Sequence, residues 1–316
     1  QFMAGAGFSS IDNVIGFLEI SQSNFDIANW PYFHGGGQKA RASLEVSSKR
    51  KIVDVSWTEP WFLDRRLSLM LEAYRRELAY REFDDIRIGA GAGITVPLPV
   101  GRLNLRYVFE GVRLEDIREG DYVFAEDPLR TYRFTDEDDK YLNSPLRLTW
   151  MYDTRNRAFV PTSGTQLSLF GEMSGRMFGG DNETYSVGIN ARRWLPLWAG
   201  HVLSLRLRAE SVDSFGRSDT VAIGDRLFLG GGRTLRGFEY RDVGPKVVPA
   251  EDRPGRHHPV GGQTLAMASA EYTIPVFKVL RLATFYDVGN VWRDSFDANT
   301  GALASSAGVG IRFDIP

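Results

Sequence analysis

Hydrophobic and polar residues alternate with a period of two along most of the chain. In 203–210, one set is Leu203, Leu205, Leu207 and Ala209, and the other is Ser204, Arg206, Arg208 and Glu210. This alternation is typical of a β-strand with one apolar and one polar face. It predicts about fourteen strands, at roughly 2–8, 14–24, 37–48, 52–60, 66–79, 86–97, 102–115, 141–154, 164–178, 183–195, 201–213, 262–275, 280–293 and 305–315. Helical periodicity and repeats of fixed length are absent, so we predict an all-β fold that is neither a propeller nor a solenoid.

The lengths of the strands and connections favour an antiparallel transmembrane β-barrel over a soluble sandwich. Many predicted strands reach the roughly 9–11 residues that cross a bilayer, whereas soluble strands average about 5–6. Short connections at 63–66, 99–102 and 197–200 alternate with longer ones, of which 116–140 and 214–261 are the longest. Such alternation is typical of outer-membrane barrels. A sheet in lipid is also expected to close on itself, because no backbone group can stay unpaired there.

Aromatic residues gather near the ends of the predicted strands, which fits the interfacial girdles of membrane barrels. They are Trp57, Trp61, Phe62, Trp194, Trp198 and Trp292. An aromatic-rich soluble β protein is the alternative that this pattern leaves open. The two folds differ in where the apolar faces point, which is inward in a soluble protein and toward lipid in a membrane barrel.

The composition excludes several classes of function. The 316 residues carry a formal net charge of −2, which gives no case for nucleic-acid binding. There is no cysteine, so a disulfide framework and thiolate metal sites are excluded, while an oxidising compartment remains compatible. No stretch of about 18 apolar residues predicts a transmembrane helix. The chain begins at Gln1 without a secretory signal, and we expect it to be a mature or excised piece.

The connection 214–261 contains the stretch GGGRTLRGFEY, which is unusual for a surface loop. It is too long for a simple hairpin and is expected to cap the barrel or fold back into it. The glycines 230–232 allow close approach of backbones. Arg236 is flanked by Leu235 and Phe238, and a guanidinium confined in a barrel needs carboxylate partners.

Two acids on the following strands are the candidate partners of this arginine. Glu271 shares a strand face with Ser269, and Asp287 shares one with Phe285 and Gly289. The opposite faces of both strands are apolar enough for lipid, so both acids are predicted to point into the lumen.

Four motifs resemble the BamA-type outer-membrane insertase superfamily, which includes TamA and the two-partner secretion transporters. They are LRGFEY at 235–240, YDVGNVW at 286–292, MYDTRNRAFVPTSGTQLSLFGEM at 151–173 and ASAEYTIPV at 268–276. The resemblance extends from MAGAGFSS at 3–10 to GVGIRFDIP at 308–316, and the motifs are most similar to the BamA branch. Their order and spacing make the resemblance specific, whereas one RGF triplet alone would be weak.

The resemblance implies a fold and a set of site residues. The family's loop tucks into the barrel and its arginine contacts acids on the next strands, which implies a lumen latch. Its residues would be Arg236, Gly237, Phe238, Glu271, Asp287 and Gly289. This latch can serve insertion or only the stability of the barrel. The family barrel has sixteen strands, so residues 1–316 are expected to form one outer-membrane barrel domain that is incomplete at its C-terminus and lacks POTRA repeats.

The resemblance also implies a function. The chain would fold and insert β-barrel proteins into the bacterial outer membrane through a lateral seam at its first strand. That strand is Phe2, Met3, Ala4, Gly5, Ala6, Gly7 and Phe8, whose glycines can equally serve barrel curvature. The implied partners are outer-membrane lipid, unfolded β-barrel clients, POTRA repeats and accessory lipoproteins. The alternative is a protein-secretion channel or a passive pore that the 214–261 loop plugs.

Other candidate chemistry is set aside, and neither an enzyme nor a cofactor is expected. His257 and His258 stand in a Pro/Gly-rich loop, where solvated side chains are a better expectation than metal ligands. Gly89, Gly91 and Gly93 predict a lumen-facing strand relieved of bulk, because no helix follows for a dinucleotide site. The acidic run at 136–140 is read as a solvated loop. No nucleophile elbow and no Ser/His/Asp set at matching strand ends is present.

Overall fold

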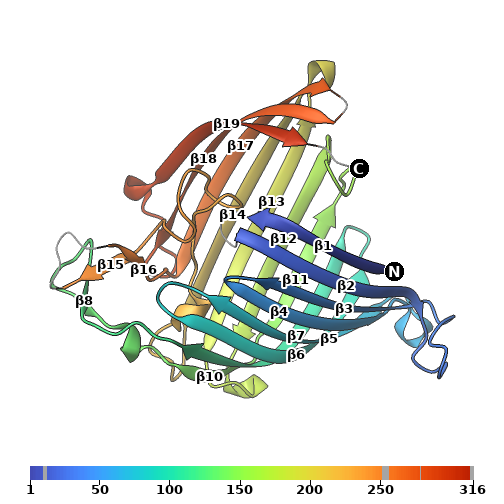
Figure 1. The fold of residues 1–316 in the computed structure, drawn as a ribbon, viewed down its shortest axis with the longest axis horizontal. Helices are drawn as coiled ribbons and strands as arrows, with labels where there is room; N and C mark the ends of the chain where they lie inside the picture. Colours follow the sequence, from blue (N-terminus) through green and yellow to red (C-terminus); the bar gives the residue numbers. More distant parts are fainter. Residues whose placement is uncertain (10–12, 251–255, 278, 314–316) are drawn as a thin grey trace.

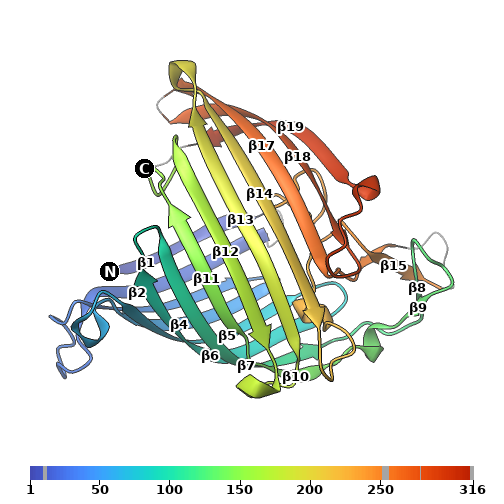
Figure 2. The ribbon, with the colours of Figure 1, turned by 180° about the vertical axis from the view of Figure 1, so that it is seen from behind.

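One large antiparallel sheet curls around an interior that is filled by a long loop (Figures 1 and 2). The computed structural model describes residues 1–9, 13–250, 256–277 and 279–313. Residues 314 and 315, which end the last predicted strand, lie outside the described residues.

The large sheet has fifteen strands, and each neighbouring pair is antiparallel. Fourteen of them follow one another in chain order. They are β1 (Phe2–Ser9), β2 (Asn13–Phe25), β3 (Gln38–Ser47), β4 (Arg50–Glu59), β5 (Ser68–Ala79), β6 (Asp84–Pro97), β7 (Arg102–Glu115), β11 (Leu146–Asp153), β12 (Gly164–Ser174), β13 (Thr184–Pro196), β14 (Val202–Ser214), β17 (Thr264–Phe277), β18 (Leu280–Trp292) and β19 (Ala304–Phe313). All fourteen predicted strands are therefore present, and the all-β antiparallel fold is confirmed.

The strand predicted at 141–154 is divided in two, which the alternation did not indicate. β10 (Lys140–Asn143) pairs with the far part of β7, and β11 pairs with the near part. Pro145 lies at the break, and a proline has no N–H to donate to a ladder. Its carbonyl instead accepts from the N–H of Val108, at 3.1 Å.

The two longest connections contain a second, four-stranded sheet that the alternation did not predict. Its order is β16 (His258–Pro259), β15 (Lys246–Pro249), β8 (Tyr122–Phe124) and β9 (Thr131–Tyr132). Figure 1 shows it beyond the end of the large sheet. The helices are single 3-10 turns: η1 (Phe62–Asp64), η2 (Phe134–Asp136), η3 (Arg176–Phe178), η4 (Trp198–Gly200), η5 (Ile223–Asp225) and η6 (Thr300–Ala302). In the described residues, no helix has the length and apolar character to cross a membrane.

The apolar faces of the strands point away from the interior. On β14 and β19, Leu205, Leu207, Val309 and Ile311 are between 41% and 86% exposed. The opposite faces turn toward the loop-filled interior, where Asp287 and Met267 are buried. Exposed apolar faces around a polar interior are the arrangement of a membrane barrel. The alternative of a soluble sandwich is therefore wrong.

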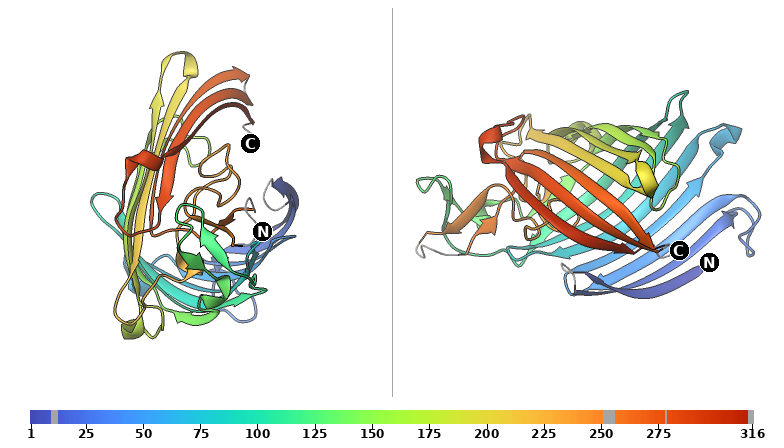
Figure 3. Two further views of the ribbon diagram at one scale, coloured as in Figure 1. Left: turned by 90° about the vertical axis from the view of Figure 1, so that its left-hand side faces the viewer. Right: turned by 90° about the horizontal axis from the view of Figure 1, so that it is seen from above.

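The sheet has two edges among the described residues, β1 and β19, and no pairing joins them. Viewed along the sheet in Figure 3, the two edges face each other across the open side of a curved wall. The expected closure of the barrel is thus not made by the strands that the structure describes. The main-chain groups on the outer sides of β1 and β19 have no ladder partner in this part of the chain.

The connections only partly follow the predicted alternation of short and long. Antiparallel order places the two longest, 116–139 and 215–263, at the same end of the sheet, which we call the long-loop end. Short turns at 48–49 and 80–83 also lie there, and the segment 26–37 lies at the other end. The three short connections named in the prediction, 63–66, 99–102 and 197–200, lie at the end opposite to the two longest ones, as predicted, but short and long connections are not fully separated between the two ends. Trp292, predicted in a girdle, is 7% exposed and donates to the carbonyl of Asn299 at 2.8 Å.

We predict that a positive charge on the outer face destabilises the barrel far more than the same charge on the inner face. Leu169 and Ser168 are adjacent in the middle of β12, and Leu169 is on the outer face. Leu169→Arg is expected to cost about 2–4 kcal/mol near the membrane midplane, and Ser168→Arg much less. Denaturant unfolding in lipid vesicles measures both variants. Equal losses would contradict the assignment of the two faces.

Candidate functional site

Part of the connection 215–263 lies inside the curve of the large sheet (Figure 3), while its strands β15 and β16 lie beyond the end of that sheet. Isolated bridges from Leu227 to Gly262 and from Leu229 to Val243 join segments within the connection. Its apolar residues pack against the inner faces of β14, β17 and β18 in one cluster. That cluster consists of Val212, Val221, Leu227, Leu229, Leu235, Val243, Leu265, Met267 and Val291. The prediction that this connection folds back into the barrel is confirmed.

Only part of the glycine run needs to be glycine. Gly230 has a φ of +118°, and a Cβ there would lie 2.4 Å from the carbonyl oxygen of Glu239. Gly231 also has a positive φ, of +96°. Gly232 has open space around the position of a Cβ, so the predicted close approach of backbones is wrong for that residue. The first two glycines turn the chain, and Arg236 follows directly after that turn.

Arg236 lies with its guanidinium between two carboxylates of the sheet. Its Nε and Nη2 atoms donate to the two oxygens of Asp287 at 2.6 and 2.7 Å, and Nη1 donates to Glu271. Its backbone N–H donates to Asp287, and Nη2 donates to Ser269 Oγ, both at 3.1 Å. The Phe285 ring stacks on the guanidinium, 3.6 Å from its centre. Asp287 is fully buried, so without the guanidinium it would be an uncompensated charge.

Glu271 links the loop to the edge strand β19. Its carboxylate accepts from Arg236 and also from Arg312, whose Nη2 is 2.8 Å from Oε2. Two guanidiniums, one from the loop and one from β19, therefore share one carboxylate of β17. The arrangement joins the loop to β17, β18 and β19 together. The sequence motifs did not indicate the contribution of Arg312.

Hydrogen bonding has a larger effect than burial on the pKa of Arg236. Burial alone would lower the pKa of Arg236, but its hydrogen bonds with Asp287 and Glu271 raise that pKa above its ordinary value. The guanidinium therefore stays charged at every physiological pH. Such a site contains no group poised to give or take a proton, and its geometry suits a fixed ion pair that holds the loop.

The remaining latch residues are packed around this ion pair. Gly237 has a φ of +85°, and a Cβ there would lie 3.2 Å from the Cβ of Ser306 on β19. Phe238 packs against the apolar cluster of the loop. A Cβ at Gly289 would lie 2.6 Å from the carbonyl oxygen of Ala266, so the two strands leave no room for a side chain there. All six predicted latch residues are thus at or beside the Arg236 site, and their role remains a prediction.

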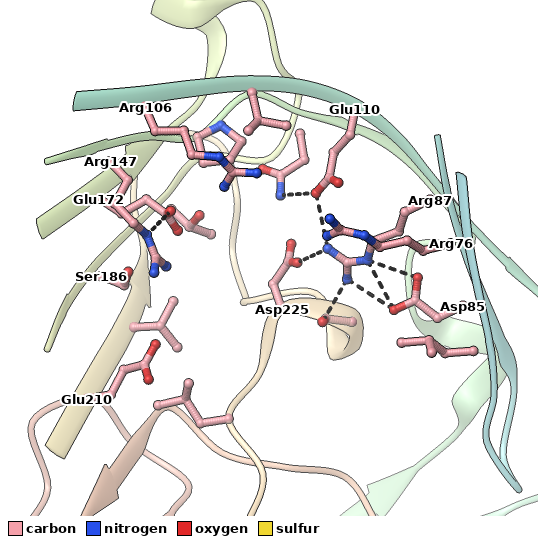
Figure 4. Close-up of a pocket in the computed structure, with 18 of the residues that line it drawn as sticks. Arg76, Asp85, Arg87, Arg106, Glu110, Arg147, Glu172, Ser186, Glu210 and Asp225 are labelled. Carbon is pink, nitrogen blue, oxygen red and sulfur yellow. Dashed lines mark hydrogen bonds and ion pairs between the residues drawn. The ribbon is translucent and has the colours of Figure 1, made fainter. Parts of the chain in front are cut away.

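A second anchor of the loop was missed by the sequence analysis. Asp225 accepts from Arg87 Nη1 on β6 at 3.0 Å, and Arg87 Nη2 donates to the Gly224 carbonyl at 2.8 Å. The other oxygen of Asp225 accepts from Asn182 at 2.7 Å and from the Tyr141 hydroxyl at 3.2 Å. Figure 4 shows Asp225 and Arg87 joined by their contact at the wall of the pocket. No motif relates Asp225 to Arg87, which is 138 positions away.

The second anchor belongs to a charged lining of the interior. Arg87 also contacts Asp85 at 3.0 Å and Glu110 at 3.2 Å. These groups border a cavity of about 400 Å3. Figure 4 shows other charged side chains pointing into it from neighbouring strands. These are Arg76, Arg106, Arg147, Glu172 and Glu210.

The glycines of β6 make room for this lining, as predicted. A Cβ at Gly89 would lie 2.7 Å from the Cβ of Glu110, and one at Gly91 would lie 3.0 Å from a Glu72 carboxylate oxygen. Gly93 is less crowded, because its nearest neighbours are 3.7 Å away.

The two adjacent histidines behave differently from the prediction that both are solvated. His258 is buried, and its Nδ1 lies 2.9 Å from Glu82 Oε1, so that prediction was wrong for His258. His257 is exposed. Burial of His258 under the small sheet could not be foreseen, because its partner comes from the turn after β5. Among the described residues, no group of three or more potential ligands could hold a metal ion.

The predicted seam strand is β1, one edge of the large sheet. It pairs with β2 along its whole length, from Phe2 opposite Ile20 to Gly7 opposite Ile15 and beyond. A Cβ at Gly5 would lie 2.6 Å from the ring of Phe17, whereas the position at Gly7 is open. Gly5 therefore leaves room for the Phe17 ring of β2, and the curvature alternative stays a prediction. The use of β1 as a seam remains a prediction.

Comparison with known proteins finds one family and several relatives. The family described as the Omp85 superfamily domain matches residues 33–316. The chain is 29% identical over 287 residues to the outer membrane protein assembly factor BamA of Nitratidesulfovibrio vulgaris, covering 89% of this chain and 34% of that protein. It is 30% identical over 179 residues to a SAM50-like protein of Drosophila melanogaster, covering 54% of this chain and 37% of the other. The chain thus spans about a third of the length of these curated relatives.

Two solved structures share the fold. BamA from Haemophilus ducreyi lacking POTRA domains 1–3 matches with a TM-score of 0.82 and 21% identity, covering 100% of this chain and 64% of that one. CdiB from Acinetobacter baumannii matches with a TM-score of 0.57 and 11% identity, covering 99% and 53%. At these identities the similarity concerns the fold.

We predict that Arg236→Ala releases the loop from the wall. The change leaves Asp287 buried without a partner, and loss of one member of a buried pair costs about 3–5 kcal/mol. The chain has no cysteine, so Ser306→Cys, under the loop, is a unique reporter. Its maleimide labelling is expected to accelerate in Arg236→Ala. Arg233→Ala, an exposed change on the same loop, is the control, and equal acceleration in both would refute the latch.

We also predict that Gly237 is required for its backbone conformation. Gly237→Ala places a side chain at positive φ and against Ser306, at a cost of about 1–2 kcal/mol. Gly232→Ala is the matched control, because its φ is not in the left-handed region and its surroundings are open. Thermal unfolding in detergent micelles compares the two. A control variant as unstable as Gly237→Ala would show that the contact is unimportant.

Proposed function

Because this chain belongs to the Omp85 superfamily, we propose that it is the barrel of an assembly factor that folds and inserts β-barrel proteins into the outer membrane. Two of its relatives carry names that describe assembly of outer-membrane proteins. Proteins of this kind need a place where an unfolded strand can begin to pair. The structure has two such edges, β1 and β19, at the two sides of one wall.

The edge of β1, to which no described strand pairs, is the observation that carries the proposal. An edge strand presents a row of free N–H and C=O groups, which template the addition of another strand. The apolar side chains of β1 are exposed, with Phe2 at 67% and Phe8 at 80%. A client strand added there would have its backbone paired and its apolar face in lipid. It could then serve as the template for the next strand.

The latch at Arg236 has a defined part in this proposal. Glu271 joins the loop to Arg312 on β19, so the ion pairs stiffen the strands next to one edge. A stiff wall on the β17–β19 side would leave movement to the β1 side. The latch would thus position the loop and the edge strand, without touching the client.

The proposed activity makes and breaks no covalent bond, so the protein is not an enzyme in this proposal. Its energy would come from pairing the client's backbone and burying its apolar face in lipid. The proposed location is the bacterial outer membrane. The proposed partners are outer-membrane lipid, unfolded β-barrel clients, POTRA repeats and accessory lipoproteins.

We predict that a client strand can be cross-linked to β1 but not to a central strand. Met3→Cys places a unique thiol on β1, and Leu205→Cys places one on the outer face of β14. A stalled client with single cysteines along its last strand is co-expressed with each variant. Disulfide adducts are expected with Met3→Cys alone. Adducts of equal yield with both thiols, or none with Met3→Cys, would refute the proposal.

A liposome assay separates this proposal from the alternative of a channel plugged by 214–261. Reconstituted protein is expected to accelerate the insertion of an unrelated unfolded barrel protein. A plugged channel would conduct after removal of the loop, but would leave the insertion rate unchanged. No acceleration together with loop-dependent conductance would favour the channel.

A further inference from the structure

Arg241 is a buried cation that forms no direct ion pair with a carboxylate of the described residues. The residue is 9% exposed, and its Nε atom is buried without a hydrogen-bond partner in the described part of the chain. It lies on the same loop as Arg236, whose guanidinium is fully paired. Burial lowers the pKa of Arg241, in contrast to the raised pKa of Arg236. A buried, unpaired charge is costly, so its retention needs an explanation.

Aromatic rings hold the guanidinium of Arg241 in a fixed plane. Its central carbon lies 3.9 Å from the ring centre of Tyr80 and 3.3 Å from that of Phe228. Phe83 is further away, at 5.8 Å. Such contacts attract the cation to the faces of the rings. Contacts with the faces leave the N–H donors, which lie in the plane, available to an acceptor at the edge.

Arg241 is among the residues that line a cavity of about 820 Å3 at the long-loop end of the interior. The cavity lies between the turns after β3 and β5 on one side and loop residues 231–242 on the other. Its lining includes Arg241 and two exposed cations, Lys49 and Arg81, for which the described residues provide no ion pair within the cavity. Positively charged side chains therefore border the cavity both at its buried wall, with Arg241, and at its exposed rim, with Lys49 and Arg81.

Most acidic residues of this lining are already engaged. Glu82 pairs with His258 at 2.9 Å, and Asp242 pairs with Lys246 at 2.9 Å. Glu239 is exposed, at the solvent side of the cavity. The cavity is thus positive on balance where Arg241, Lys49 and Arg81 border it.

We propose that this cavity binds a phosphate-bearing anion, with Arg241 as the bidentate donor and Lys49 and Arg81 as cations at the rim. A planar guanidinium matches two phosphate oxygens, and its fixed plane lowers the entropy lost on binding. Small-ligand sites typically enclose about 300–1,000 Å3, so the cavity can hold more than the phosphate group itself. A phosphorylated sugar and the headgroup of a phosphorylated lipid both carry the required chemistry. This inference does not depend on the proposed insertase function.

Occupancy would also fix the loop from its second side. Arg236 attaches the loop to β17 and β18, and a ligand at Arg241 would attach it to the turns beside β4 and β5. The ligand would then link the loop to these turns. Among the described contacts of Arg241, only those with the rings of Tyr80 and Phe83 make that link.

The test is a calorimetric titration of the purified chain in zwitterionic detergent micelles. The probes are inorganic phosphate, glucose 1-phosphate, and phosphatidic acid in mixed micelles, with phosphatidylcholine, whose headgroup is zwitterionic and has no net charge, as the lipid comparison. Arg241→Gln is expected to weaken binding about tenfold or more, because a charge-assisted hydrogen bond contributes about 1.5–3 kcal/mol. Lys49→Gln combined with Arg81→Gln is expected to weaken it about threefold, as exposed charges contribute less.

Arg233→Gln is the matched control, because it removes one exposed positive charge from the same loop outside this cavity. Its affinity is expected to stay within about twofold of that of the unchanged protein. If Arg241→Gln fails to fold, two other variants test the proposal. One is the double variant Lys49→Gln with Arg81→Gln, and the other is Arg241→Lys, which keeps the positive charge but loses the bidentate guanidinium. Tighter binding of glucose 1-phosphate indicates a soluble ligand, and tighter binding of phosphatidic acid indicates a headgroup. The proposal is overturned if no probe saturates the unchanged protein, or if Arg233→Gln weakens binding as much as Arg241→Gln.

Discussion

The orientation of the sheet imposes the constraint on which the rest of the structure depends. The apolar faces of the strands point outward, so the interior surface is polar and carries many full charges. A loop that enters such an interior cannot be held by apolar packing alone, because most of the wall offers none. It must bring charges that match those of the wall. Arg236 and Asp225, at two places on the loop, do this with opposite signs.

The two anchors attach the loop to opposite parts of the wall. Arg236 meets β17 and β18, while Asp225 meets Arg87 on β6 and Asn182 before β13. Between the anchors, the apolar cluster around Leu229 and Leu235 is shared by the loop and the inner faces of β14, β17 and β18. The loop is therefore a second structural layer that crosses the concave side of the sheet. Its contacts stiffen a wall whose edges, β1 and β19, have no strand between them in the described residues.

The same loop presents arginines in two distinct environments. Arg236 is surrounded by carboxylates that raise its pKa, and its charge is fully used within the protein. Arg241 is surrounded by aromatic rings, and it lines a cavity. Their different partners distinguish Arg236, which forms a structural ion pair, from Arg241, whose hydrogen-bond donors can still bind a ligand. Positions five residues apart can thus have different roles, which the spacing of the charges alone does not reveal.

The sequence by itself determined the strands and the faces that they present. The alternation of apolar and polar residues around Leu205 and Leu207 indicates a strand whose two faces lie in different environments. Successive side chains of an extended chain point to opposite faces. The alternation also placed Glu271 and Asp287 on inner faces, and the motif around Arg236 identified the loop that meets them. These are local properties, or properties carried by a motif that recurs across a family.

Only the tertiary structure decided the contacts that join distant segments without a shared pattern. Arg87 and Asp225 come together because the loop crosses the interior, and His258 is buried in the small sheet, where it contacts Glu82 and the ring of Tyr122. The break at Pro145, and the edges of β1 and β19 that no described strand pairs, likewise depend on which strand lies beside which. The physical reason is that periodicity records the environment on each side of a strand, whereas pairing and burial depend on the arrangement of the whole chain in space.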